Sequence, residues 1–138
     1  MRWLLVGLSI ALAACGTPVE SPKPPPAEKS LEINKKGEMV DIDSNLPAGY
    51  VTVVDFWADW CGGCTHVGGL LAVGVAQDPG IVIRKVDVGE GTTPVAHAYQ
   101  INVLPHFRIY DKQKRLRYDL VANDCLKATE IAHQLAAE

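Results

Sequence analysis

The sequence contains no hydrophobic run long enough to cross a bilayer. Its longest apolar segment, WLLVGLSIALAA at 3–14, has 12 residues, whereas a membrane-spanning helix needs about 20. An excess of positive charge is also missing, because 13 basic residues stand against 16 acidic ones and the net charge is −3. This balance gives no electrostatic reason to expect binding to nucleic acid or to an anionic membrane surface.

Cysteine is scarce, and its placement argues against several kinds of site. The chain has four cysteines, of which only Cys61 and Cys64 lie close together, in DFWADWCGGCTH at 55–66. A zinc finger needs a second pair of ligands at suitable spacing, and none is present. Attachment of c-type haem needs a histidine directly after the second cysteine, where this chain has Thr65. A structural disulfide across so short a loop would remove little chain entropy.

The N-terminus is expected to be an export signal rather than part of the fold. Arg2 precedes the apolar segment, so residues 1–14 are predicted to be a signal peptide. ALA at 11–13 fits ordinary secretory cleavage. LAAC at 12–15 resembles the bacterial lipoprotein box, in which cleavage precedes a cysteine that is lipidated. We favour the second interpretation, with Cys15 as the lipidation site.

A proline-rich segment separates the signal from the domain. Residues 15–30 hold five of the nine prolines and little apolar content, so we expect an extended, semi-rigid tether. At about 3.1 Å per residue, it would span roughly 45 Å. No internal repeat is visible, and 31–138 has the length of one domain.

The order of predicted elements indicates an α/β domain. Apolar and β-branched runs predict strands, and helical spacing or capping residues predict helices. Strands are expected at 37–43, 50–57, 81–88, 106–110 and 115–121, and helices at 61–77, at 92–100 and from Asn123 or Asp124 onward. Strand–helix–strand units imply a parallel portion with helices on its faces. The last two strands are expected to form an antiparallel hairpin.

The cysteine pair falls where a strand gives way to a helix. A helix N-terminus carries partial positive charge and unpaired N–H groups, which stabilise a thiolate. Cys61 is therefore expected to be the nucleophile. Cys64 lies about one helical turn later, close enough to attack a mixed disulfide formed on Cys61.

The segment VVDFWADWCGGC at 53–64 resembles the active-site segment of thioredoxin-fold proteins. IVIRKVDV at 81–88 is similar to the family's next strand, and YQINVLPHFRIY at 99–110 is similar to the segment with its cis-proline. About 100 residues are covered. The resemblance implies a thioredoxin-like fold, with a central mixed sheet and helices on both faces. It also implies a Cys61–Cys64 dithiol–disulfide pair.

The same resemblance assigns roles around the pair. Asp55 resembles the family's buried aspartate, which helps to move the proton of the resolving cysteine. In an apolar strand its pKa should rise. Lys85 is expected to neighbour Asp55 and to tune that pKa, and Trp60 to flank the site. The bond between Leu104 and Pro105 is the candidate cis bond, beside which an extended substrate pairs with the backbone.

Departures from the family concern the residues between and after the cysteines. Gly62 and Gly63 separate the pair, and the family's commonest reductant has proline in place of Gly63. By resemblance, this change tends to make a site more oxidising. Gly69 also replaces a common proline. His106 follows the candidate cis-proline, where it either bonds a thiolate or simply begins a strand.

The preferred interpretation is a thiol–disulfide oxidoreductase acting on exported proteins, with no organic cofactor and no metal. It is expected to be extracytoplasmic, periplasm-facing and lipid-anchored. By resemblance to lipoprotein sorting in bacteria with two membranes, Gly16 after Cys15 weakly favours the outer membrane. A reducing role would need a membrane electron donor, and reduction, oxidation and isomerisation all stay open.

The alternative is a copper or zinc carrier. It would use both close-set cysteines and a histidine, with His66, His97 and His106 as candidates. Cys125 is expected to be a buried or semi-buried free thiol, with a regulatory or intermolecular disulfide as the alternative.

Overall fold

The computed structural model describes residues 26–138. The predicted signal peptide, the lipidation site Cys15 and most of the predicted tether lie outside the described residues. Within 26–138, no helix combines the length and the apolar composition needed to cross a membrane. The first strand begins at Ser30, the last residue of the segment predicted as the tether.

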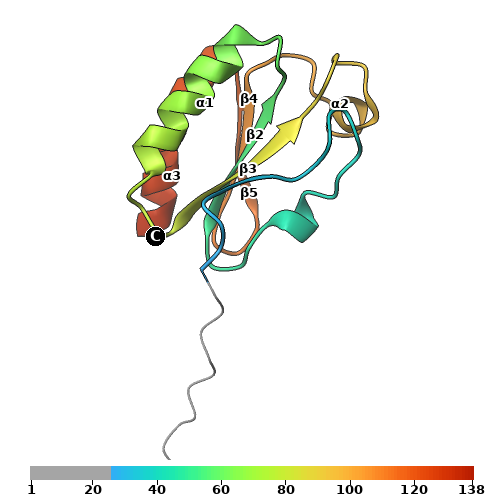
Figure 1. The fold of residues 1–138 in the computed structure, drawn as a ribbon. Coiled ribbons are helices and arrows are strands. Elements are labelled where there is room, and N and C mark those ends of the chain that lie inside the picture. The colour runs from blue at the N-terminus through green and yellow to red at the C-terminus, as the bar shows by residue number, and fades with distance from the viewer. Residues whose placement is uncertain (1–25) are drawn as a thin grey trace, which may run out of the picture.

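A five-stranded mixed sheet forms the centre of the domain (Figure 1). Its strands are β1 (Ser30–Glu32), β2 (Val51–Trp57), β3 (Ile81–Asp87), β4 (His106–Tyr110) and β5 (Leu116–Val121). Their order is β1-β3-β2-β4-β5, with β3 parallel to both β1 and β2. β4 runs antiparallel to β2, and β5 antiparallel to β4. The mixed sheet and its terminal hairpin were both predicted.

Helices cover both faces of the sheet, as the sequence predicted. The helices are α1 (Gly62–Val75), α2 (Pro94–Ala98) and α3 (Ala128–Ala137), with short 3-10 helices η1 (Asp43–Asn45) and η2 (Ala122–Lys127). α1 and α3 pack together on one face, and α2 lies on the other (Figure 1). Side chains alternate along β2. Val53 therefore joins the core under α1 and α3, and Phe56 joins the core on the α2 side.

The prediction of a strand at 37–43 is wrong. This stretch is a loop that leads into η1, and two of its backbone groups are hydrogen-bonded to one side chain. The Tyr99 hydroxyl donates to Val40 O at 2.8 Å and accepts from Ile42 N–H at 3.1 Å. Gly37 has a positive φ of 74° and donates its N–H to Asp87 O. The chain therefore bends away from the sheet edge, which β1 occupies instead.

The two hydrogen bonds predict that the Tyr99 hydroxyl contributes strongly to the stability of the folded protein. Tyr99→Phe should lower the free energy of unfolding by about 1–3 kcal/mol, because it leaves two backbone groups of the loop without their partner. Tyr118→Phe, at an exposed position of β5, should change it by less than about 0.5 kcal/mol. Urea denaturation of both variants measures the difference. Equal stabilities of the two would contradict the bridging role of Tyr99.

The predicted start of the last helix also needs correction. Neither Asn123 nor Asp124 caps α3, because η2 comes first and no side chain caps either helix. Ala122 has a left-handed φ of 53° and donates its N–H to Pro105 O. The tight backbone turn after β5 thus starts a 3-10 helix, and Asp124 pairs with Lys127 instead.

Candidate redox site

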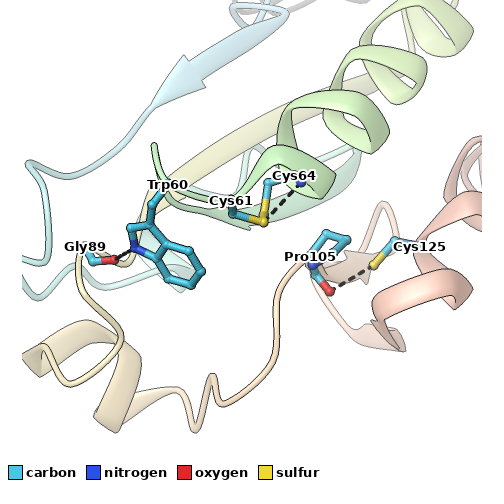
Figure 2. The surroundings of a disulfide bond; sticks show 6 residues. All are labelled: Trp60, Cys61, Cys64, Gly89, Pro105 and Cys125. Carbon is cyan, nitrogen blue, oxygen red and sulfur yellow. Dashed lines mark hydrogen bonds between the residues drawn. A yellow bond between two sulfur atoms is a disulfide. The ribbon is translucent and has the colours of Figure 1, made fainter.

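Cys61 and Cys64 form a disulfide at the N-terminus of α1, directly after β2 (Figure 2). Their Cα atoms are 5.3 Å apart. Cys61 is the N-cap residue of α1, and its sulfur accepts a hydrogen bond from the Cys64 N–H at 3.1 Å. The apolar strand β2 ends just before the helix, and this junction fixes the position of the pair.

The two sulfurs have different surroundings. Cys61 is 8% exposed and Cys64 is 3% exposed, so Cys61 is the more accessible of the two. After reduction, the N–H that bonds Cys61 and the partial positive charge of the helix end both stabilise a thiolate there. These features favour a thiolate at Cys61, and the division between an attacking and a resolving cysteine stays a prediction.

Trp60 and Pro105 lie on either side of the disulfide in Figure 2. Trp60 is 57% exposed, and its indole N–H donates to Gly89 O at 2.8 Å. The Leu104–Pro105 bond is cis, as predicted. A Cβ atom at Gly63 would lie 3.7 Å from Pro105 Cδ, which is an ordinary contact, so the cysteine loop and the proline are adjacent.

Asp55 is buried on β2, with 3% of its surface exposed. Its Oδ1 has no hydrogen-bond partner among the described residues. Burial raises the pKa of the Asp55 carboxyl to about 7, an effect that the Lys85 ammonium opposes and the Glu32 carboxylate increases. Lys85 is the register partner of Asp55 on β3, as predicted. Such a carboxyl can take up or release a proton near neutral pH.

A cleft of about 440 Å³ has both Asp55 and Cys64 in its wall. It lies between α1 and the β1 side of the sheet, and it is lined by Asp55, Trp57, Cys64, Gly68 and Lys85 among others. The cleft therefore brings Asp55 and Cys64 to one solvent-connected space.

Two glycines of α1 in this wall should respond differently to alanine. At Gly69 a Cβ atom meets nothing within 4 Å, so Gly69→Ala should raise the free energy of unfolding by about 0.5–1 kcal/mol through helix propensity. At Gly68 it would lie 3.0 Å from Asp55 Oδ2, so the carboxyl must move and the gain should be smaller or reversed. Thermal and urea unfolding of the matched pair measures this. Equal gains would show that the Asp55 carboxyl is not held against the helix.

The histidines are not gathered at the cysteines. His106 begins β4, where its Nε2 pairs with Asp119 and its ring packs edge-on against Phe56. Of the two roles considered for His106, the structure thus favours the strand-start position. His66 and His97 are exposed on α1 and α2. Within residues 26–138, no group of three or more His, Cys, Asp or Glu side chains is placed to hold a metal ion.

Cys125 is a buried free thiol, as predicted, with 2% of its surface exposed. Its sulfur lies 3.5 Å from Pro105 O and 3.3 Å from Leu120 O, and it donates to these carbonyls. Burial raises the pKa of Cys125 to about 11, and the charge of Asp55 adds to this rise. Cys125 is therefore a poor nucleophile at neutral pH, and it lies on the side of Pro105 that faces away from the disulfide (Figure 2).

Two side chains beside the cleft, those of Glu32 and Trp57, were not identified from the sequence. The Trp57 indole N–H donates to Glu32 Oε1 at 3.1 Å, and the Lys85 ammonium lies 4.3 Å from the centre of the Trp57 ring. Glu32 escaped notice because β1 has only three residues and follows the proline-rich segment. Its position opposite Lys85 depends on strand pairing, which no local pattern at 30–32 reveals.

Comparison with known proteins points to one family. The thioredoxin family model matches residues 40–137. The chain is 40% identical over 60 residues to a thioredoxin H-type of Oryza sativa subsp. indica, an alignment covering 44% of this chain and 48% of that protein. It is 37% identical over 60 residues to a thioredoxin of Mycoplasma pneumoniae, covering 44% and 58%. The chain thus spans about half the length of the curated relatives it matches.

A solved structure of a thioredoxin has the same fold as this chain. The reduced thioredoxin pre-protein of Schistosoma mansoni superposes with a TM-score of 0.60 and 26% identity. That superposition covers 78% of this chain and 99% of the other. The likeness therefore includes the whole of that domain, and not only the segment around the cysteines.

Proposed function

The chain belongs to the thioredoxin family, and on this premise we propose that it is a thiol–disulfide oxidoreductase acting on exported proteins. The observation that carries the proposal is the Cys61–Cys64 disulfide at the N-terminus of α1, with Pro105 beside it. Relatives described as thioredoxins support the same class of chemistry.

The first step of the reductive direction uses Cys61. Its thiolate attacks one sulfur of a substrate disulfide, a mixed disulfide forms, and the other substrate sulfur leaves as a thiolate. The Cys64 N–H, which bonds the Cys61 sulfur in the oxidised protein, is placed to stabilise the attacking thiolate. Trp60 and Pro105 line the surface that the substrate approaches.

The second step uses Cys64 and Asp55. Cys64 loses its proton and attacks the Cys61 sulfur, the bond from Cys61 to the substrate breaks, and the substrate leaves as a second thiolate. The Asp55 carboxyl shares a cleft with Cys64 and is the group that accepts the proton. The oxidative direction is the reverse sequence, in which the protein disulfide accepts the electrons of two substrate thiols.

An exchange assay combined with a metal titration tests the proposal. The wild type and His66→Ala should both turn over a model disulfide, whereas Cys61→Ala should not. Copper and zinc binding should not depend on His66. If the wild type lacks turnover and His66→Ala abolishes tight stoichiometric metal binding, the cysteines are ligands and the carrier interpretation replaces the enzyme.

We further propose that the domain works outside the cytoplasm, anchored to a membrane through a lipid on Cys15 and facing the periplasm. The apolar segment and LAAC at 12–15 support this. In that oxidising compartment, a reducing role requires electrons from a membrane partner. Wild-type protein should partition with membranes, and Cys15→Ser should release or misprocess it. Fully soluble wild-type protein with its N-terminus at Ala14 would contradict the lipid anchor.

A further inference from the structure

Three ionisable side chains stand in one row across the parallel part of the sheet. Lys85 of β3 is the register partner of Asp55 on β2 and of Glu32 on β1. Neighbouring strands lie about 4.8 Å apart, so the backbones of Glu32 and Asp55 are separated by roughly 10 Å, with Lys85 between them. The row runs from an exposed carboxylate at the edge strand to a buried carboxyl in the interior.

The indole of Trp57 connects the members of this row. Trp57 follows Asp55 by two residues on β2 and therefore projects from the same face of the sheet. Its N–H donates a hydrogen bond to Glu32, and the Lys85 ammonium lies over its ring, 4.3 Å from the ring centre. A cation in this place is attracted to the negative face of the ring. Trp57 and Lys85 both line the cleft that leads to Asp55.

From these contacts we propose that Glu32 is a positioning residue for proton exchange at Asp55. Glu32 holds the Trp57 indole by a hydrogen bond, and the indole holds the Lys85 ammonium in the wall of the cleft. Glu32 itself does not line the cleft. This inference rests on the proposed function, in which Asp55 accepts the proton of Cys64.

Four titratable groups surround Asp55, and two of them carry no charge near neutral pH in the oxidised protein. Lys85 faces it from β3 and Glu32 from β1, while Cys64 of α1 shares its cleft and Cys125 of η2 lies within reach of its charge. Cys64 does not titrate in the disulfide, and the pKa of Cys125 is raised by burial to about 11. Near neutral pH the charges acting on Asp55 are therefore those of Lys85 and Glu32.

The test compares Glu32→Gln with Glu32→Ala in the oxidised full chain carrying Cys15→Ser. The Asp55 carboxyl carbon and the Trp57 indole N–H are followed by NMR as the pH is raised at low salt. Glutamine keeps an accepting oxygen but loses the charge, so the Asp55 midpoint should fall by a few tenths of a pH unit while the indole signal stays. Alanine should also release the indole. Lys85 then moves toward solvent and supports the carboxylate less, so this midpoint should lie above that of Glu32→Gln.

Matched controls make each outcome decisive. Glu38→Gln removes an exposed charge outside the row and should leave the Asp55 midpoint in place. The Trp60 indole, bonded to Gly89 O, is the internal reference and should not shift. Equal midpoints in the two Glu32 variants, or an unchanged Trp57 signal in Glu32→Ala, would overturn the positioning role. The titration needs no turnover, so a wild type without exchange activity refutes the proposed function separately.

Discussion

A limiting amount of an alkylating reagent, added to the reduced protein near neutral pH, is expected to label Cys61 about tenfold or more in preference to Cys64. The Cys61 sulfur accepts a hydrogen bond from an N–H at the helix N-terminus, and Cys61 is the more exposed residue of the two. Peptide mapping of the adduct measures the preference. Because turnover depends on this thiolate, Cys61→Ala should reduce disulfide exchange to the uncatalysed background.

The two single serine variants provide the matched comparison. Cys64→Ser should accumulate mixed disulfides with substrates through Cys61, because the resolving thiol is gone, and Cys61→Ser should accumulate none. A Cys125→Ala background removes the third thiol of the domain, which is buried and should not alter either result. Preferential labelling of Cys64, or trapping by Cys61→Ser, would reverse the assignment.

The parts of the fold that the sequence predicted are those with strong local patterns. β2 reads as a nearly continuous apolar strand because both of its faces are buried, and Thr93 followed by Pro94 marks the start of α2. The segment at 37–43 has a strand-like composition, but its backbone groups bond to Tyr99, which is more than 50 residues away in sequence. A contact at such a distance leaves no trace in local composition.

The same distinction separates the predicted and the unpredicted parts of the site. The cysteines and Pro105 lie in segments similar to a known family, so their positions followed from resemblance. Glu32 lies in a three-residue strand, and its relation to Asp55 exists only because β3 pairs with both β1 and β2. Register is a property of the assembled sheet, so the contribution of Glu32 to the charge environment of Asp55 became visible only in the structure, whereas Lys85 was expected from the resemblance.

The pH dependence of stability should carry the signature of Asp55. Its pKa is raised by burial from 3.8 to about 7 in the folded protein, so the native state holds a proton that the unfolded chain has lost between these values. Stability should therefore fall as the pH rises from about 4 to about 7 and then level off. The loss attributable to this carboxyl is at most on the order of 4 kcal/mol.

Asp55→Asn removes the titration while keeping the shape of the side chain. At pH 8 the variant should be more stable than the wild type by up to about 4 kcal/mol, because the wild type must bury a carboxylate there. At pH 4 the difference should nearly vanish, since both side chains are then neutral. Urea denaturation of the oxidised proteins at intervals between these pH values measures the two curves, and Asp43→Asn at an exposed position should follow the wild type.

Asp55→Asn should also resolve mixed disulfides more slowly, because no carboxylate accepts the Cys64 proton. Parallel stability curves for Asp55→Asn and the wild type would mean that the buried carboxyl titrates like an exposed one, and the proton route through the cleft would lose its acceptor.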